Sequence, residues 1–389
     1  MAFIKDFIHA IRNVVGPGQH HLHEPNFGGA EAEYLKDCLD TRMVSYIGPY
    51  VGKFEDAIAQ EVGVEFCFAT NTGTSALHLA LIAAKIRPGD EVLIPAFCFV
   101  APANAVKYIG ATPHFVDVDR RTLGLNVEKI EEYLSGHSVI RDGGCYNIKT
   151  GNHISALVPM HTFGHPVDMD SVLSLAKKYS LRVIEDAAEG VGSTYKKMHV
   201  GCLGHLGTLS FNGNKIITTG GGGAVVTNNS DLFERVRHLG TTAKIPNRID
   251  FFHDEIGYNY RMPNLNAAVG YAQLESLNAK VMAKRKLYQL YQDTFAGLNG
   301  VALFSEADSR RSNYWLQTVI LDSELACRRD EIIHACNEVG IFVRPAWNLL
   351  NELPAFKDCP TMDVSIAKDL QKRIINLPSS PGLLENLTS

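Results

Sequence analysis

The chain has 389 residues, 46% of them hydrophobic and 20% charged, and a formal net charge of −5. This length allows a large buried core and predicts two lobes, and the composition is that of an ordinary soluble globular protein. The acidic balance gives no reason to expect a nucleic-acid-binding surface. No apolar stretch approaches the roughly 20 residues that a membrane span needs.

The N-terminal segment and the cysteines both indicate a cytoplasmic protein. Apolar residues recur with helical spacing in residues 1–15, where charged residues interrupt them. We therefore expect an amphipathic helix and not a signal peptide. Eight cysteines are scattered without a CxxC pair, which is typical of reduced thiols in a cytoplasmic enzyme and not of a disulfide framework.

Short apolar strands alternate with helices between about residues 64 and 229. This alternation predicts an α/β fold with a mostly parallel sheet that helices cover on both faces. In such sheets ligands bind beyond the carboxyl ends of the strands, so the loops that follow strand ends are candidates for a site. The expected strands are 65–69, 91–94, 112–116, 156–160, 182–184, 208–211 and 224–227, and the expected helices are 74–85, 101–109, 127–135 and 169–179.

The C-terminal third has a different pattern. Residues 266–295 are expected to form one long helix or two close ones, and strand patterns at 314–321 and 341–343 alternate with a helix at 329–339. We expect an N-terminal helix at 1–20, a large domain at 21–265, and a connecting helix with a smaller α/β domain at 266–389.

A possible phosphate site lies at residues 71–77, Asn-Thr-Gly-Thr-Ser-Ala-Leu, which precede an apolar helix. The free N–H groups of a helix start and a threonine hydroxyl suit a phosphate. Ordinary N-capping by Thr or Ser explains the same residues. Farther along, Phe97 and Phe99 follow a strand end, where one ring could stack on an aromatic ligand and the other could pack in the core.

Lys215 lies in a turn between a strand-like run and four consecutive glycines, and Asp186 ends an earlier apolar strand between Glu185 and Glu189. A lysine on a loop and a carboxylate at a strand end are what pyridoxal phosphate needs. The amine bonds to the cofactor, and the carboxylate keeps the pyridine nitrogen protonated. A structural salt bridge is the alternative for Asp186, but three neighbouring carboxylates are less easily explained by structure alone. We therefore predict a pyridoxal-phosphate site, with residues 71–77 at the phosphate and Glu189 facing the reacting carbon.

Two further segments carry candidate binding residues. His161 and His165 are four residues apart, but glycine and proline break a helix there, so we expect no metal and place His161 behind the cofactor. Tyr258, Asn259 and Arg261 form a polar cluster that indicates a binding role, with a loop that caps the next helix as the alternative. Candidate donor or nucleotide contacts are Tyr314, Trp315, Arg344 and Trp347, although Trp315 could equally belong to the core.

Five motifs together resemble the sugar aminotransferase family called DegT/DnrJ/EryC1/StrS, whose members are pyridoxal-phosphate enzymes of fold type I. The motifs are Asn-x-Gly-Thr-x-Ala-Leu at 71–77, Gly-Asp-Glu-Val at 89–92, Glu-Asp-Ala-Ala at 185–188, Ser-Phe-x-x-x-Lys at 210–215 and Gly-x-Asn-x-Arg-Met at 257–262. The resemblance runs from about residue 22 to the C-terminus. It implies a large domain with a mostly parallel mixed sheet flanked by helices and a smaller C-terminal α/β domain.

The resemblance implies a role for each matching residue around the cofactor ring. Lys215 would bond to the cofactor and act as the general acid and base, and Asp186 would pair with the pyridine nitrogen. Phe99 would stack on the ring. Glu189 stands where the family usually has Gln, near the cofactor and the sugar. The expected substrate contacts are Glu189, Tyr258, Arg261 and Tyr314.

The resemblance also implies how the phosphate is held. Gly73, Thr74 and Ser210 would contact it within one subunit. Asn259 would reach it from the neighbouring subunit of a homodimer, which places each active site at the subunit interface.

Within the family, residues 210–215 and 158–166 look most like the branch that aminates C4 of a nucleotide-linked 4-keto-6-deoxy-N-acetylglucosamine. This implies transfer from L-glutamate to a UDP-linked sugar, giving the 4-amino sugar and 2-oxoglutarate for bacterial surface glycans of the bacillosamine or legionaminic type. A GDP-linked substrate of the legionaminic type is the alternative. A related dehydratase would carry His in place of Lys215, and a non-catalytic protein would need neither Lys215 nor Asp186, which counts against both.

Overall fold

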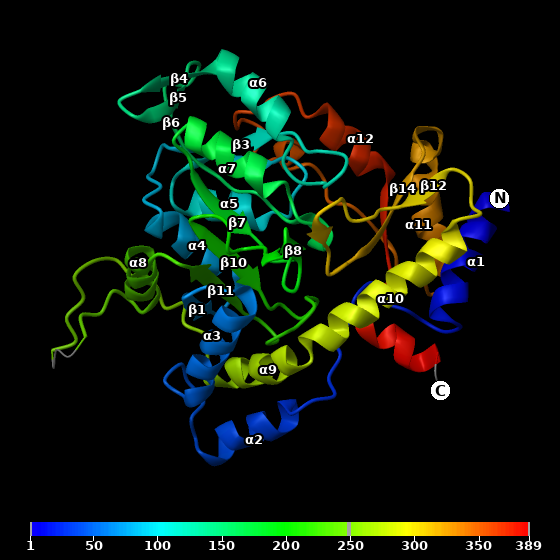
Figure 1. Cartoon of the computed structure of the whole chain (residues 1–389), viewed down its shortest axis with the longest axis horizontal. Helices are drawn as coiled ribbons and strands as arrows, with labels where there is room; N and C mark the ends of the chain where they lie inside the picture. Colours follow the sequence, from blue (N-terminus) through cyan, green and yellow to red (C-terminus); the bar gives the residue numbers. More distant parts are fainter. Residues whose placement is uncertain (1, 247–249, 388–389) are drawn as a thin grey trace.

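The computed structural model of the chain describes residues 2–246 and 250–387 and has a large mixed sheet at its centre (Figure 1). Within these residues the sheet has nine strands; its main path runs β1-β11-β10-β7-β6-β2-β3, and β5 and β4 extend from β6. β11 is antiparallel to both neighbours, whereas the strands from β10 to β3 are parallel. The predicted α/β fold is confirmed. The strands are β1 (Phe66–Thr70), β2 (Glu91–Pro95), β3 (Thr112–Val116), β4 (Ser138–Arg141), β5 (Gly144–Asn147), β6 (His153–Leu157), β7 (Arg182–Asp186), β10 (Leu206–Ser210) and β11 (Gly223–Thr227).

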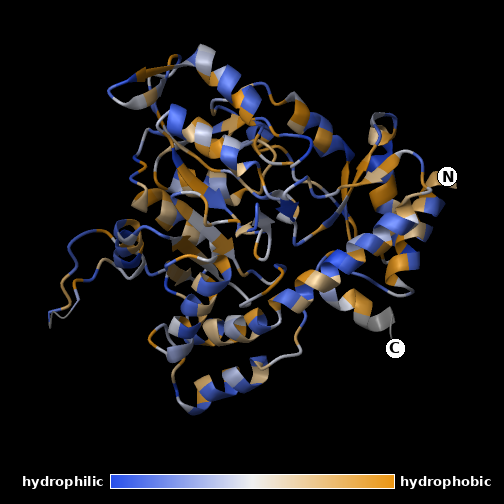
Figure 2. Cartoon of the chain, viewed as in Figure 1, coloured by the Kyte–Doolittle hydropathy of each residue, from blue (hydrophilic) through white to orange (hydrophobic). Residues whose placement is uncertain are grey.

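Helices bury the central strands on both faces. β2, β10 and β11 are buried along their whole length, as expected for strands in a covered sheet. α4 packs across β10 and β11, and α3 packs against β1. Figure 2 shows hydrophobic residues on the central strands and a mixture of both kinds along the outer helices. The helices of this part are α2 (Glu31–Asp40), α3 (Pro49–Val62), α4 (Gly73–Ala83), α5 (Ala101–Tyr108), α6 (Val127–His137), α7 (Met169–Lys178), α8 (Ser230–Gly240) and α9 (Asn264–Glu275).

A second, antiparallel sheet lies in the C-terminal part, in the order β12-β14-β16-β15. Its residues share a hydrophobic core with α1 and α10, to which Phe7, Ile11 and Tyr291 contribute fully buried side chains. No helix in the described ranges combines the length and the apolar character that crossing a bilayer requires. The elements are α1 (Ala2–Val15), α10 (Leu277–Phe295), β12 (Val301–Leu303), β14 (Gln317–Leu321), α11 (Arg329–Glu338), β15 (Arg344–Pro345), α12 (Ser365–Arg373) and β16 (Ile374–Leu377).

Some predicted elements differ in their bounds. Of the two alternatives expected at 266–295, two close helices form, α9 and α10, which Ser276 separates, and the first begins two residues earlier than expected. The strand predicted at 314–321 begins only at Gln317, because Tyr314 has a positive φ of 49°. The N–H groups of Tyr314 and Trp315 bond to the side chains of Ser312 and Asn313 and not to a neighbouring strand.

The chain positions its site at the carboxyl ends of neighbouring strands. β7 ends at Asp186 beside β10, and β10 leads directly into the turn that carries Lys215. β1 leads into the start of α4. Segments far apart in the sequence therefore meet at one edge of the sheet, as expected for parallel strands.

Candidate active site

A cavity of about 330 Å³ lies at this edge of the sheet. It brings together the predicted residues Gly73, Thr74, Phe99, Asp186, Glu189, Ser210, Lys215, Trp315 and Trp347 with further side chains from distant loops. The lining residues are Thr72, Gly73, Thr74, Leu77, Phe99, Ala101, Met160, Asp186, Ala188, Glu189, Ser210, Asn212, Asn214, Lys215, Gly221, Gly222, Trp315 and Trp347.

The Lys215 side chain lies between a carboxylate and an aromatic ring. Its Nζ donates to Glu189 Oε1 at 3.2 Å and lies 3.9 Å from the centre of the Trp315 ring. The Lys215 backbone N–H closes a turn onto Asn212 O (2.9 Å), and the Trp315 indole N–H bonds to Asn214 O (2.8 Å). The turn and the amine are thus held from several sides, which limits the positions that the amine can take.

Glu189 is a buried carboxyl that shares its two oxygens between Lys215 and the Phe163 backbone. Its Oε2 accepts the Phe163 N–H at 2.8 Å. Burial raises the pKa of Glu189 from 4.5 to about 7, although the Lys215 ammonium and the Phe163 N–H oppose the rise. Glu189 can therefore both hold and release a proton near neutral pH, next to the lysine amine.

Asp186 fits the pyridine nitrogen of pyridoxal phosphate. It is 2% exposed, and its Oδ1 accepts the Ala188 N–H at 3.1 Å. Burial raises the pKa of Asp186, while the Ala188 N–H and the charge of Lys215 oppose the rise. Among the described residues no basic side chain forms an ion pair with it, so a buried carboxylate at the cavity wall is left for a cationic ligand group.

The start of α4 fits a phosphate. Thr72 caps the helix by accepting the Ser75 N–H (3.0 Å) on its side-chain oxygen, and the first intrahelical bond runs from Ala76 N–H to Thr72 O. The N–H groups of Gly73 and Thr74 precede that bond and point along the helix axis into the cavity end. A Cβ on Gly73 would lie 3.0 Å from the Ser210 Cβ. Glycine therefore lets the helix start approach the Ser210 hydroxyl closely enough to share a ligand.

His161 lies one layer behind the cavity. Its Nε2 donates to Glu185 Oε2 (3.0 Å) and its Nδ1 accepts the Val167 N–H (3.2 Å), so the ring is neutral with its proton on Nε2. Burial alone would raise the pKa of Glu185, but the bond from His161 and backbone N–H groups lower it. The backbone N–H of His161 bonds to Asp186 O (3.1 Å), so His161 supports the strand end that carries Asp186.

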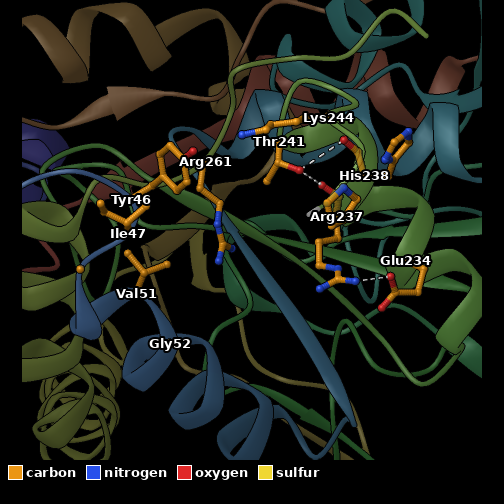
Figure 3. A pocket seen from close by; sticks show the side chains of 12 residues that line it. Tyr46, Ile47, Val51, Gly52, Glu234, Arg237, His238, Thr241, Lys244 and Arg261 are labelled. Atoms are coloured by element: carbon orange, nitrogen blue, oxygen red, sulfur yellow. Dashed lines mark hydrogen bonds and ion pairs between the residues drawn. The ribbon is translucent and has the colours of Figure 1, made fainter. Parts of the chain in front are cut away.

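Besides His161, the predicted residues Arg261, Asn259, Tyr258 and Tyr314 also lie outside this cavity. Arg261 pairs with Glu55 and lines a second cavity of about 700 Å³ between α3 and α8 (Figure 3). Asn259 is exposed, and Tyr258 stacks on a neighbouring tyrosine. Tyr314 is 3% exposed and packs against another tyrosine ring at 4.2 Å. None of the four lines the cavity that contains Lys215.

Trp315 and Trp347 line the cavity, and they are the two tryptophans of the sequence. For Trp315 the sequence had predicted a position in the core as readily as one in the site. Asn212 and Asn214 were not predicted as site residues, although the sequence signal was present, since both belong to the Asn-Gly-Asn turn before Lys215. Arg344 lies on β15 as an exposed residue away from the cavity.

Comparison with known proteins decides the family. The model of the DegT/DnrJ/EryC1/StrS aminotransferase family matches residues 25–387 of the chain. The chain belongs to this family. GDP-perosamine synthases of Caulobacter vibrioides and Escherichia coli O157:H7 are 39% and 38% identical to it over 362 residues, covering 93% of each chain. The solved aminotransferase from Psychrobacter cryohalolentis matches with a TM-score of 0.83 and 29% identity, covering 93% of this chain and 94% of that one.

Membership of the DegT/DnrJ/EryC1/StrS family agrees with the cavity. The chain is a pyridoxal-phosphate-dependent sugar aminotransferase, which takes an amino donor and a sugar substrate. The fold is that of pyridoxal-phosphate aminotransferases. Lys215, Asp186, Gly73, Thr74 and Ser210 all line this cavity, and their chemistry suits the ring and the phosphate of this cofactor.

Proposed function

We propose that this aminotransferase moves the amino group of L-glutamate to C4 of a nucleotide-linked 4-keto-6-deoxyhexose used in surface-glycan biosynthesis. The observation that carries the proposal is the position of the Lys215 amine, 3.2 Å from the Glu189 carboxyl and on the face of Trp315, in the cavity that Asp186 also lines. An amine beside a proton-sharing carboxyl suits a reaction that moves protons to and from carbon.

Each residue has a distinct proposed task. When bound, pyridoxal phosphate supplies a carbonyl that bonds to amines and a ring that accepts electrons. Lys215 anchors it and moves protons at the reacting carbon. Asp186 keeps the ring nitrogen protonated, because a buried carboxylate strongly favours a cationic neighbour. Phe99, at the mouth of the cavity, stacks on the ring.

Glu189 is proposed to keep the Lys215 amine reactive. A lysine must be neutral when it takes a proton from carbon. With the pKa of Glu189 near 7, the carboxylate at 3.2 Å can accept a proton from the lysine and return it later in the cycle. Phe163 N–H holds the other oxygen in place, so the exchange needs no movement of the carboxyl group.

The carrier of the sugar is proposed to be GDP. Two relatives at 38–39% identity over nearly the whole chain are named for GDP-perosamine, a GDP-linked amino sugar. The UDP-linked N-acetyl sugar is the second candidate, which the likeness of residues 158–166 and 210–215 to the bacillosamine and legionaminic branch favours.

A substrate panel tests the proposal. The purified protein, with L-glutamate, is given GDP- and UDP-linked 4-keto-6-deoxy sugars that carry either a hydroxyl or an N-acetyl group at C2. Formation of 2-oxoglutarate and the NMR spectrum of the product are followed, with Lys215→Ala as the control. We expect a C4 amine on the GDP-linked sugar without the N-acetyl group. No amination of any of the four sugars would refute the proposed function.

We also propose that the protein is a homodimer in which Asn259 reaches the phosphate of the neighbouring subunit. Asn259 lies on an arm formed by residues 241–246 and 250–259, whose two sides are joined by a bridge between Lys244 and His253. The arm projects from the body after α8 (Figure 1). Ile256 on the arm is 82% exposed and Ile47 near the second cavity is 72% exposed. Exposed apolar surface of this kind favours burial against another chain.

Mixed dimers test this arrangement. Co-expression of Lys215→Ala and Asn259→Ala subunits creates heterodimers in which one of the two sites has both residues. If each variant alone is inactive, we expect the mixture to regain about a quarter of the wild-type activity, as random pairing of two symmetric subunits gives. A monomer in sedimentation, or no regained activity in a stable heterodimer, would contradict the proposal.

A further inference from the structure

Asn313 is a fully buried amide in the segment between β13 (Arg310–Arg311) and β14. Its side chain forms three hydrogen bonds to backbone groups. Oδ1 accepts the Trp315 N–H at 2.7 Å, and Nδ2 donates to Glu189 O and to Val191 O, both at 2.8 Å. Both amide protons and the acceptor are therefore in use, and no other side chain of this size offers two donors and an acceptor.

The two ends of this amide hold the two residues that touch the lysine amine. The Glu189 carboxyl lies 3.2 Å from Lys215 Nζ, and the Trp315 ring centre lies 3.9 Å from it. The Trp315 indole also bonds to the backbone oxygen of Asn214. The Asn313 side chain thus bonds to the backbone of both residues, Glu189 and Trp315, whose side chains contact the Lys215 amine.

The surroundings leave Asn313 little freedom to move. Its own N–H donates to Ser193 Oγ (2.9 Å), which in turn donates to Gly164 O (2.8 Å). Gly164 has a φ of +90°, and a Cβ there would lie 1.9 Å from Asn313 Oδ1. The residue before it, Phe163, donates its N–H to the Glu189 carboxyl. The backbone and the carboxyl of Glu189 are therefore held by two adjoining parts of one buried network.

We propose that Asn313 is a positioning residue, which fixes Glu189 and Trp315 on opposite sides of the Lys215 amine. This inference rests on the proposed role of Lys215 as the amine that moves protons. Asn313 itself touches neither the amine nor the cavity. Its effect comes from setting the distance between the Lys215 amine and the Glu189 carboxyl. A displacement of a catalytic group by about 1 Å can lower a rate on the order of a hundredfold.

Asn313→Asp is the sharpest test, because Asp keeps the shape and the acceptor for the Trp315 N–H but, ionised or not, loses at least one of the two donors to the 189–191 backbone. We expect the rate of amino transfer from glutamate to fall by about 10- to 100-fold with little change in KM. Since burial raises the pKa of Glu189 to about 7 and Lys215 opposes the rise, we also expect displacement of Glu189 to alter the pH profile near neutrality. Asn264→Asp is the matched control: Asn264 is fully buried, accepts the Tyr50 N–H on Oδ1, donates to Met43 O through Nδ2, and does not line the cavity.

A fluorescence measurement needs neither cofactor nor substrate. The sequence has two tryptophans, so in a Trp347→Phe background the emission of the cofactor-free protein comes from Trp315. We expect Asn313→Asp to shift this emission to longer wavelength and to increase quenching by acrylamide, and Asn264→Asp to do neither. Because this result does not depend on catalysis, it stands even if the proposed sugar substrate is wrong.

The outcomes separate a positioning role from a merely structural one. Asn313→Asp protein that is less stable but keeps the wild-type pH profile and Trp315 quenching would overturn the inference. If Asn313→Asp does not fold, Ser193→Ala removes one bond to Asn313 and should shift the same two measurements in the same direction by a smaller amount. Unchanged quenching and pH profile in Ser193→Ala would then overturn it.

Discussion

Replacement of Glu189 by Gln should remove a pH-dependent loss of stability. Gln has the same size and keeps an acceptor for one of the two donors, Lys215 Nζ and the Phe163 N–H, but it carries no ionisable proton. In the wild-type protein burial raises the pKa of Glu189 from 4.5 to about 7. This makes ionisation of Glu189 cost about 3 kcal/mol more in the folded protein than in the unfolded chain, at about 1.4 kcal/mol per pKa unit.

The sign of this pH dependence of stability follows from proton binding. Because the folded pKa is the higher one, the folded protein binds more protons than the unfolded chain between pH 4.5 and about 7. The stability that the protonated carboxyl contributes is fully present below pH 4.5 and is lost as the pH rises through about 7. Since Glu189 is 4% exposed, solvent screens the effect little.

Urea unfolding of the cofactor-free wild-type and Glu189→Gln proteins measures the effect at about pH 5 and about pH 8. We expect the free energy of unfolding of the wild type, relative to the variant, to fall by about 2 to 3 kcal/mol over this interval. Glu338→Gln, at the exposed end of α11, serves as the control and should show almost no such change. If the difference in free energy of unfolding between the wild type and Glu189→Gln stays constant with pH, the reasoning about Glu189 is refuted.

Three further substitutions test the site. Lys215→Ala should lower the rate of amino transfer by at least about 10²- to 10⁴-fold, since it removes the general acid and base; near-wild-type turnover would exclude the proposed role. Asp186→Asn should lower the same rate by about 100-fold or more, because a neutral amide cannot hold the ring nitrogen protonated, and unchanged turnover would contradict this. Gly164→Ala should destabilise the protein by about 2 kcal/mol or more in urea, because the new Cβ meets Asn313 Oδ1 at a positive φ; wild-type stability would show that the network relaxes freely.

The sequence predicted those parts of the site that local chemistry determines. Asp186 and Ser210 end strands, Lys215 lies in the turn after one, and Gly73 and Thr74 start a helix. Strand–helix alternation was therefore sufficient to bring them to one edge. Glu189 stood out because three neighbouring carboxylates, Glu185, Asp186 and Glu189, are less easily explained by structure alone. The alternation of apolar strands and helices likewise predicted the main sheet, because its strands are covered on both faces.

Sequence patterns could not predict contacts between segments that are distant in the chain. Asn313 bonds to backbone more than 120 residues earlier in the chain, and such a bond leaves no periodic signal. Tyr314 was expected at the substrate, but the turn that Asn313 stabilises directs its ring into the protein. Trp315 could not be assigned to core or cavity for the same reason. Arg261 was expected near the substrate and instead pairs with Glu55 within the subunit.

Mapping the lysine that carries the cofactor tests the central claim most directly. The protein is loaded with pyridoxal phosphate, the bond between cofactor and lysine is reduced with borohydride, and the digested peptides are analysed by mass spectrometry. We predict that the pyridoxyl phosphate group lies on Lys215, and that Lys215→Ala protein treated in the same way carries none. A label on another lysine, with Lys215 unmodified, would contradict the assignment of this cavity as the active site.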